Sequence, residues 1–185
     1  MSSPSLSVVM PTYDAAEYIE RSLKSIFRQS FEDYELIIVD DGSTDGTIDL
    51  IKERDDERLR LIEREKESGI TSALNRGIDE SSGKYIARHD ADDWSMPDRF
   101  NKQITYFETH PDVALVGTGA YLVDEDGKRI TERRVLEDPN VEDLIDHNEF
   151  IHGSVMMRRE PLVGLGGYDE RFLTAEDYDL WLRLA

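Results

Sequence analysis

The chain has 185 residues, a length that suits one domain with a substantial hydrophobic core. Its 41 acidic and 22 basic residues give a formal net charge of −19, which argues against nucleic acid as a partner, because that binding depends on neutralising phosphates. The absence of cysteine excludes disulfides, thiolate metal sites and cysteine nucleophiles. No apolar run reaches the length of a membrane span and no signal-peptide pattern opens the chain. We therefore expect a cytoplasmic location, either free or peripheral at the inner face of the membrane.

The acidic excess comes with a biased choice of basic residues, six lysines against sixteen arginines. Such a surface resembles that of salt-adapted proteins, in which high ionic strength screens the repulsion between like charges. The composition therefore favours a halophilic protein, and an ordinary acidic protein from a low-salt cell is the alternative.

The first half of the chain alternates between short apolar runs and amphipathic stretches. Strands are expected at Leu6–Met10, Glu35–Asp40, Leu59–Ile62 and Tyr85–Arg88. Apolar residues at helical spacing predict three intervening helices. The first begins near Asp14, its expected N-cap, and has an apolar stripe at 19–27; the other two carry apolar residues at 48–51 and 70–78. Repeated strand–helix units of this length predict a parallel sheet with helices on its faces.

The pattern changes after Asp93. A capping signal at Ser95 predicts a helix that runs to about His110. Strands are expected at 113–116 and 155–158, a small β-hairpin at 120–130 and a surface helix at 137–148. A final amphipathic helix is still in progress at Ala185, so we expect a longer protein. The fold class is thus α/β, with a mostly parallel central sheet flanked by helices, in a single domain over 1–185.

Three Asp-x-Asp triplets occur, a number that chance explains in so acidic a chain. Asp124 and Asp126 fall in the expected hairpin turn, where Asp and Gly are common. Asp90 and Asp92 instead follow directly from a buried strand, where uncompensated carboxylates are costly. A bound divalent cation removes that cost, so we expect Asp90 and Asp92 to form a metal site.

Seven segments stand in a fixed order along the chain, at 7–14, 35–45, 74–78, 83–87, 90–93, 166–169 and 175–181. Together they resemble family 2 glycosyltransferases, which have the GT-A fold, a Rossmann-like α/β architecture. The resemblance covers nearly the whole chain. It implies a nucleotide-sugar-binding half at 1–95 and an acceptor-side half at 96–185. Between Arg64 and Gly69 the sequence departs from the family pattern, so no donor contact is inferred there.

The resemblance also implies roles for individual residues. The expected substrate-binding residues are Pro11, Thr12, Tyr13, Asp41, Arg64, Asp90 and Ala91. Asp41 would accept a hydrogen bond from the nucleobase. Asp92, beside Asp90, would be the metal-coordinating acid, and Asp177 the catalytic base. Thr174 and Asp177 also have capping-box spacing, which leaves a purely structural role for Asp177 open. The roles of His89 and His152 are open as well: each could contact ligand or serve packing.

The function that follows is a metal-dependent inverting glycosyltransferase that uses Mn²⁺ or Mg²⁺. It would move a sugar from a nucleotide-diphosphate sugar to a hydroxyl of a glycan or lipid-linked acceptor. One base and one metal on opposite sides of the reacting carbon indicate single displacement. The alternative is a non-catalytic nucleotide-sugar-binding domain. A phosphatase of the haloacid-dehalogenase type is disfavoured, because the adjacent Asp40 and Asp41 would point to opposite faces of a strand.

Overall fold

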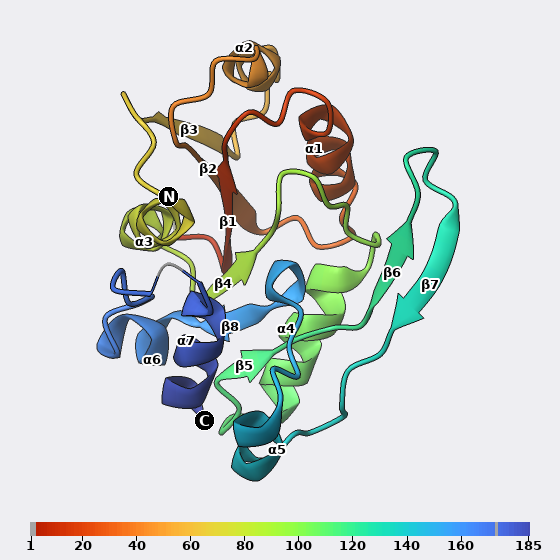
Figure 1. Cartoon of the computed structure of the whole chain (residues 1–185), viewed down its shortest axis with the longest axis vertical. Helices are drawn as coiled ribbons and strands as arrows, with labels where there is room; N and C mark the ends of the chain where they lie inside the picture. The colour runs from red at the N-terminus through yellow and green to blue at the C-terminus, as the bar shows by residue number, and fades with distance from the viewer. Residues whose placement is uncertain (1–2, 173) are drawn as a thin grey trace.

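The computed structural model describes residues 3–172 and 174–185, and its centre is a six-stranded sheet (Figure 1). The strand order is β3-β2-β1-β4-β8-β5. The strands are β1 (Leu6–Thr12), β2 (Tyr34–Asp40), β3 (Leu59–Glu63), β4 (Tyr85–Arg88), β5 (Leu115–Val116) and β8 (Met156–Arg158). The first four run parallel, whereas β8 is antiparallel to both β4 and β5. The predicted mostly parallel sheet is confirmed.

Helices cover both faces of the sheet because alternate apolar residues of its strands point to opposite sides. Val8 and Met10 of β1 face the layer formed by α1 (Ile19–Phe27), α2 (Thr47–Lys52) and α4 (Arg99–Thr109). Val9 faces the layer formed by α3 (Ile70–Glu80), α6 (Arg159–Gly164) and α7 (Glu176–Leu184). The strands are consequently buried on both sides, as their near-continuous apolar sequence predicts.

The second half adds small elements around this core. The predicted hairpin is confirmed as β6 (Ala120–Val123) and β7 (Arg129–Arg133), which form a separate two-stranded sheet beside the central one (Figure 1). Helix α5 (Val141–Asp146) is shorter than the predicted 137–148, because Asn140 caps it through a capping box with Asp143. The sequence patterns do not predict the 3₁₀ turn η1 (His152–Ser154) or helix α6.

Two predicted helix starts are wrong. Helix α1 begins at Ile19 rather than near Asp14, whose φ of 45° and hydrogen bond from the Thr44 N–H place it in a turn. Helix α4 begins at Arg99, and the Ser95 hydroxyl accepts from the Arg99 guanidinium at 3.0 Å instead of capping the helix. Within residues 3–172 and 174–185, every helix is too short or too polar to cross a bilayer.

Candidate functional site

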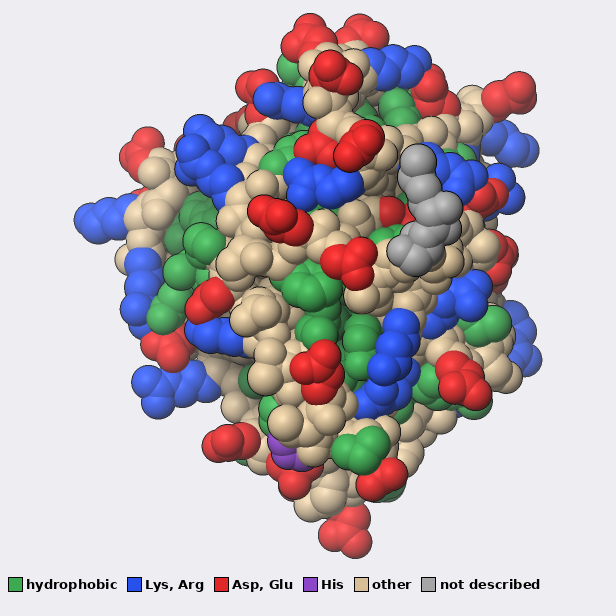
Figure 2. All heavy atoms as spheres, turned by 180° about the vertical axis from the view of Figure 1, so that it is seen from behind, with side chains coloured by type: hydrophobic (Ala, Val, Ile, Leu, Met, Phe, Trp, Pro, Cys, Tyr) green, Lys and Arg blue, Asp and Glu red, His purple; other side chains and the backbone are tan. Residues whose placement is uncertain are grey.

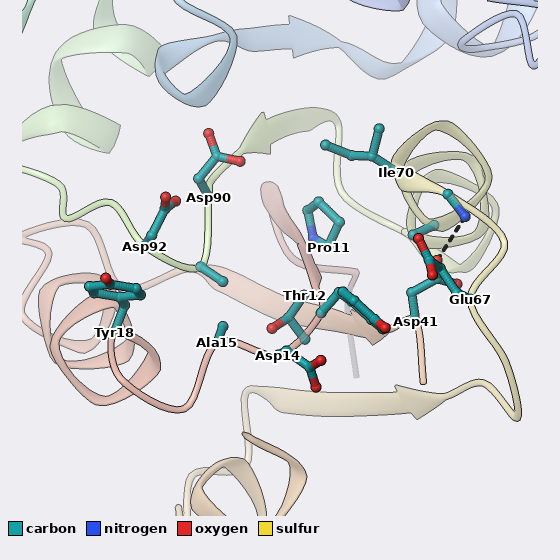
Figure 3. A pocket seen from close by; sticks show the side chains of 14 residues that line it. Pro11, Thr12, Asp14, Ala15, Tyr18, Asp41, Glu67, Ile70, Asp90 and Asp92 are labelled. Atoms are coloured by element: carbon teal, nitrogen blue, oxygen red, sulfur yellow. Dashed lines mark hydrogen bonds between the residues drawn. The ribbon is translucent and has the colours of Figure 1, made fainter. Parts of the chain in front are cut away.

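A cavity of about 390 Å³ opens at the carboxyl ends of the parallel strands (Figure 3). Strand β1 contributes its end and the loop that follows, and the segments directly after β2 and β4 contribute acidic residues. This is the position where open α/β sheets bind ligands. Seven residues that the sequence nominated line the cavity: Pro11, Thr12, Tyr13, Asp41, Asp90, Ala91 and Asp92.

The adjacent carboxylates of Asp40 and Asp41 have different environments. Asp40 is fully buried, and its Oδ1 accepts from the N–H groups of Gly42 and Ser43 at 3.1 and 2.9 Å, which closes the turn after β2. Asp41 faces the cavity, and its Oδ2 accepts from the N–H groups of Ser68 and Gly69, both at 2.8 Å. Asp41 therefore ties the start of α3 to the end of β2.

Arg64 lies behind this wall rather than in it. Its Nη1 is 3.2 Å from Oδ1 of Asp41, and its Nη2 donates to the Ser72 hydroxyl at 3.1 Å. Within the described residues, the hydroxyl of Thr12 is buried without a hydrogen-bond partner, and the equally buried Oδ1 of Asp41 has only this ion pair with Arg64, which lacks hydrogen-bond geometry. Unsatisfied buried oxygens are costly, so these atoms are suited to a donor group that arrives with a ligand.

The opposite end of the cavity is acidic. The guanidinium of Arg88, whose residue is 3% exposed, pairs with the carboxylate of Asp90. Asp92 projects at the rim near Tyr18 (Figure 3). Asp93 is an exposed residue, but partial desolvation of its carboxylate and the charges of Asp90 and Asp92 raise its pKa to about 6.

The acidic end fits a divalent cation that a ligand helps to hold. No group of three or more His, Cys, Asp or Glu in the described residues could hold a metal on its own. Mg²⁺ and Mn²⁺ accept hard oxygen ligands, and Mg²⁺ in nucleotide sites commonly takes only one or two protein carboxylates, with phosphates and water completing the shell. Asp92 makes no hydrogen bond or ion pair with any described residue, whereas Asp90 is engaged by Arg88. Asp92 is therefore the better-suited ligand of the two.

Asp177 is not in the cavity wall. It is half-buried in the first turn of α7, where its Oδ2 accepts from the Asn148 amide at 3.0 Å. The capping box predicted from Thr174 is wrong: the N-cap is Ala175, with φ of 63°, and no side chain caps this helix. Asp177 does lie in the first turn, where an acid also favours the helix dipole. The Asn148 amide therefore orients the Asp177 carboxylate.

The two histidines whose roles the sequence left open, His89 and His152, serve packing and local hydrogen bonding. His89 is buried, with its Nδ1 2.7 Å from the Asp90 carbonyl, and burial lowers its pKa to about 3. His152 places Nε2 2.9 Å from the Tyr168 hydroxyl, with its ring centroid 5.8 Å from that of Trp181. Burial and the nearby charge of Arg88 lower the pKa of His152 to about 2. Both rings stay neutral near pH 7.

Several cavity residues were missed. Glu67 comes from the segment in which the sequence departs from the family pattern, and Gly69 and Ile70 follow it at the start of α3. This loop reaches the cavity through the backbone bonds to Asp41. Tyr18, immediately before α1, also lines the wall. The sequence signal for Tyr18 as a cavity residue was its aromatic side chain, which lies between Glu17 and the apolar stripe of α1.

Comparison with known proteins decides the family. Residues 7–165 match the model of "Glycosyl transferase family 2". The chain belongs to this family. Among curated relatives, EpsE of Bacillus subtilis, named as a glycosyltransferase, is 37% identical over 98% of this chain and 67% of its own length. The amylovoran biosynthesis glycosyltransferase AmsE of Erwinia amylovora is 33% identical over 96% of this chain and 68% of its own length. The chain is thus a family 2 glycosyltransferase domain spanning about two thirds of these relatives.

Solved structures share the fold. Residues 1–349 of TarS from S. aureus superpose with a TM-score of 0.80 at 19% identity, over 97% of this chain and 55% of that one. The mannosyltransferase PcManGT from Pyrobaculum calidifontis, in complex with GDP-Man and Mn²⁺, gives a TM-score of 0.74 at 23% identity, over 97% of this chain and 51% of that one. The predicted GT-A architecture is confirmed.

Proposed function

We propose that this domain catalyses metal-dependent, inverting transfer of a sugar from a nucleoside-diphosphate sugar to an acceptor hydroxyl. The observation that carries the proposal is the division of the cavity. One end offers Tyr13 and the carboxylate of Asp41, and the other offers the carboxylates of Asp90 and Asp92. A nucleoside at the first end brings its diphosphate toward the second.

Each end has a distinct task. Oδ1 of Asp41 accepts an N–H of the nucleobase, and Tyr13, which is 49% exposed, packs beside it. The Thr12 hydroxyl and Pro11 complete the nucleoside wall. Every residue that lines the cavity lies between 11 and 92, which supports a donor-binding half at 1–95 and an acceptor-side half at 96–185.

Asp92, with Asp90 beside it, would hold Mn²⁺ or Mg²⁺ against the diphosphate, and the ion would supply neutralisation of the charge that develops on the leaving group. Arg88 pairs with Asp90 and so keeps that carboxylate oriented. Asp177, oriented by Asn148, takes the proton of the acceptor hydroxyl as the new bond forms. A single base of this kind gives one displacement and inversion at the anomeric carbon.

The acceptor is a hydroxyl of a growing glycan or a lipid-linked saccharide. Two relatives carry names that support this class: AmsE, an amylovoran biosynthesis glycosyltransferase, and WbnJ of Escherichia coli, an O-antigen biosynthesis glycosyltransferase. TarS has been crystallised with UDP and with UDP-GlcNAc. Uridine nucleotides are accordingly the first probes to use.

Calorimetry with UDP and GDP, with and without Mn²⁺, tests donor binding. Asp92→Asn should abolish the metal-dependent gain in affinity and leave the melting temperature unchanged. Asp124→Asn, in the hairpin turn, is the matched control and should bind like wild type. Equal affinity of wild type and Asp92→Asn in the presence of Mn²⁺ would contradict the metal assignment.

Asp177→Asn separates catalysis from binding. The full-length enzyme carrying it should bind nucleotide normally and lose about 10²–10⁴-fold in transfer, because the amide cannot accept the proton. Asp179→Asn, which loses only a partly exposed ion pair with Arg183, is the control. Undiminished transfer by Asp177→Asn would place the base elsewhere, with Glu176 next. A wild-type protein that binds donor and never transfers would support the non-catalytic alternative.

A further inference from the structure

Two sequence motifs that the proposed mechanism leaves without a role meet in the structure. Asn75 lies on α3, and Tyr168 follows the Gly166–Gly167 pair. The Asn75 Nδ2 donates to the Tyr168 carbonyl at 2.8 Å, and the Tyr168 N–H donates to Asn75 Oδ1 at 2.9 Å. One side-chain amide thus satisfies both backbone groups of a residue 93 positions away.

The glycine pair allows this contact. Gly166 and Gly167 have φ of 81° and 71°, in the left-handed region that favours glycine. A Cβ on Gly167 would lie 2.7 Å from Oδ1 of Asn75, too close for the amide to reach Tyr168. Glycine at position 167 therefore leaves the space that Asn75 needs to bond Tyr168 and hold the turn at 166–168.

Helix α7 holds the same turn from the other side. Arg183 donates to the Gly167 carbonyl at 2.9 Å and to the Leu165 carbonyl at 3.3 Å. Arg183 also forms a partly exposed ion pair of 2.8 Å with Asp179, one helical turn earlier. The turn is consequently bonded to α3 through Asn75 and to α7 through Arg183.

Tyr168 extends this connection into the core. It is buried, its hydroxyl is bonded to His152, and its ring centroid lies 6.4 Å from that of Trp181 on α7. Helices α3 and α7 pack on the same face of the sheet (Figure 1). A shift of Tyr168 would therefore displace Trp181, and with it the helix whose first turn carries Asp177.

We infer that Asn75 is a positioning residue, which holds Tyr168 and thereby sets α7 and Asp177 relative to the donor cavity at the start of α3. The inference rests on the proposed function of Asp177 as the base. Asn75 does not line the cavity, so it acts through the turn at 166–168 and not on the donor itself. Gly69 and Ile70, at the other end of α3, do line it.

The test replaces Asn75 by Asp and, separately, by Ala. Aspartate keeps the size but cannot donate to the Tyr168 carbonyl, and alanine removes both bonds without adding charge. Hydrogen exchange of the amides at 176–184 should accelerate at least tenfold. With full-length enzyme, Mn²⁺ and UDP- and GDP-sugars as probes, kcat should fall about ten- to hundredfold, because a misplacement near 1 Å can cost about 10²-fold. The donor KM and the calorimetric affinity for UDP should stay within twofold.

Tyr34→Phe is the matched control, because it removes one buried hydrogen bond, to the Ile26 carbonyl at 3.0 Å, on the opposite face of the sheet. It should lower stability without changing kcat or the exchange of 176–184. Wild-type exchange at 176–184 in both Asn75 variants would overturn the inference, as would an equal loss of kcat in Tyr34→Phe. Failure of the wild type to bind or turn over any probe would refute the proposed function instead, and the exchange measurement would still decide whether Asn75 holds α7.

Discussion

Gly153 lies against the charged side chains at the acidic end of the cavity. A Cβ at this position would come within 2.6 Å of Asp93 Oδ2, 2.7 Å of Asp90 Oδ2 and 3.3 Å of Arg88 Nη1. The absence of a side chain at 153 therefore lets Arg88 and Asp90 pair while Asp93 stays beside them. This requirement cannot be read from the sequence, because η1 brings Gly153 to the site from a distant part of the chain.

Gly153→Ala should displace these carboxylates and disturb the Arg88–Asp90 pair. We expect a loss of about 1–3 kcal/mol in the free energy of unfolding, typical of overpacking at a tight site, and weaker Mn²⁺-dependent binding of UDP. Chemical denaturation and calorimetry measure the two effects. Gly164→Ala is the control, since no atom lies within 4 Å of its added methyl, and it should leave both unchanged or raise stability slightly. Unaltered Mn²⁺-dependent binding in Gly153→Ala would contradict the role given to this glycine.

The residues of the cavity that could be predicted are those that follow strands. Asp41 and Asp92 sit directly after apolar runs, and the ends of parallel strands meet at one edge of a sheet. Glu67, in the loop before α3, and Ile70, the first residue of α3, could not be found in this way, because that loop is placed by hydrogen bonds from backbone N–H groups to Asp41. Backbone donors are common to nearly all residues and leave no sequence signal.

At the scale of elements, strands were predicted more accurately than helix starts. Each strand of the parallel core carries its own apolar run, whereas a capping residue is read from a single polar side chain. Asp14 and Ser95 have the residue types of caps, but Asp14 is bonded to the Thr44 N–H and Ser95 to Arg99. Asp14 and Ser95, which local rules assigned to helix ends, are thus engaged in tertiary hydrogen bonds instead. Asn140 does follow the local rule: on the surface helix α5 its side chain caps the helix and, within 3–172 and 174–185, makes no competing tertiary hydrogen bond.

Elements η1 and α7 are joined by the contacts of His152 with Tyr168 and Trp181, and this junction should depend on pH. Burial and Arg88 lower the folded-state pKa of His152 to about 2, against about 6.5 in an unfolded chain. Between these values the unfolded state binds a proton that the folded state does not, so stability falls as pH drops below about 6.5. His152 should contribute about 1–2 kcal/mol of the loss between pH 7 and pH 5.

Urea unfolding at pH 7 and pH 5 measures this contribution. His152→Gln should be less stable than wild type at pH 7 but should lose less stability on going to pH 5. His147→Gln removes an exposed histidine and should keep the wild-type difference. A His152→Gln variant with the full wild-type difference between the two pH values would show that His152 does not produce it.

The whole molecule carries far more negative charge than its own ion pairs neutralise. In the part of the chain that the structure describes, ten of the 41 acidic side chains form an ion pair. The space-filling view in Figure 2 shows acidic groups spread over that face among basic ones rather than gathered in one patch. The excess of negative charge follows from composition alone, and on the face shown it is distributed rather than local.

This surface should make stability rise with salt. The screening length falls from about 10 Å at 0.1 M to about 3 Å at 1 M ionic strength, which removes most repulsion between separate surface charges. The ion pairs lost to the same screening are mostly exposed and contribute at most about 1 kcal/mol each. The melting temperature should therefore be higher in 1 M KCl than in 0.1 M KCl. Excluded solutes also favour compact states, so sucrose at matched osmolality is the control and should raise the melting temperature by less. A melting temperature that stays flat or falls between the two KCl concentrations would count against salt adaptation and leave the ordinary acidic protein as the explanation of the composition.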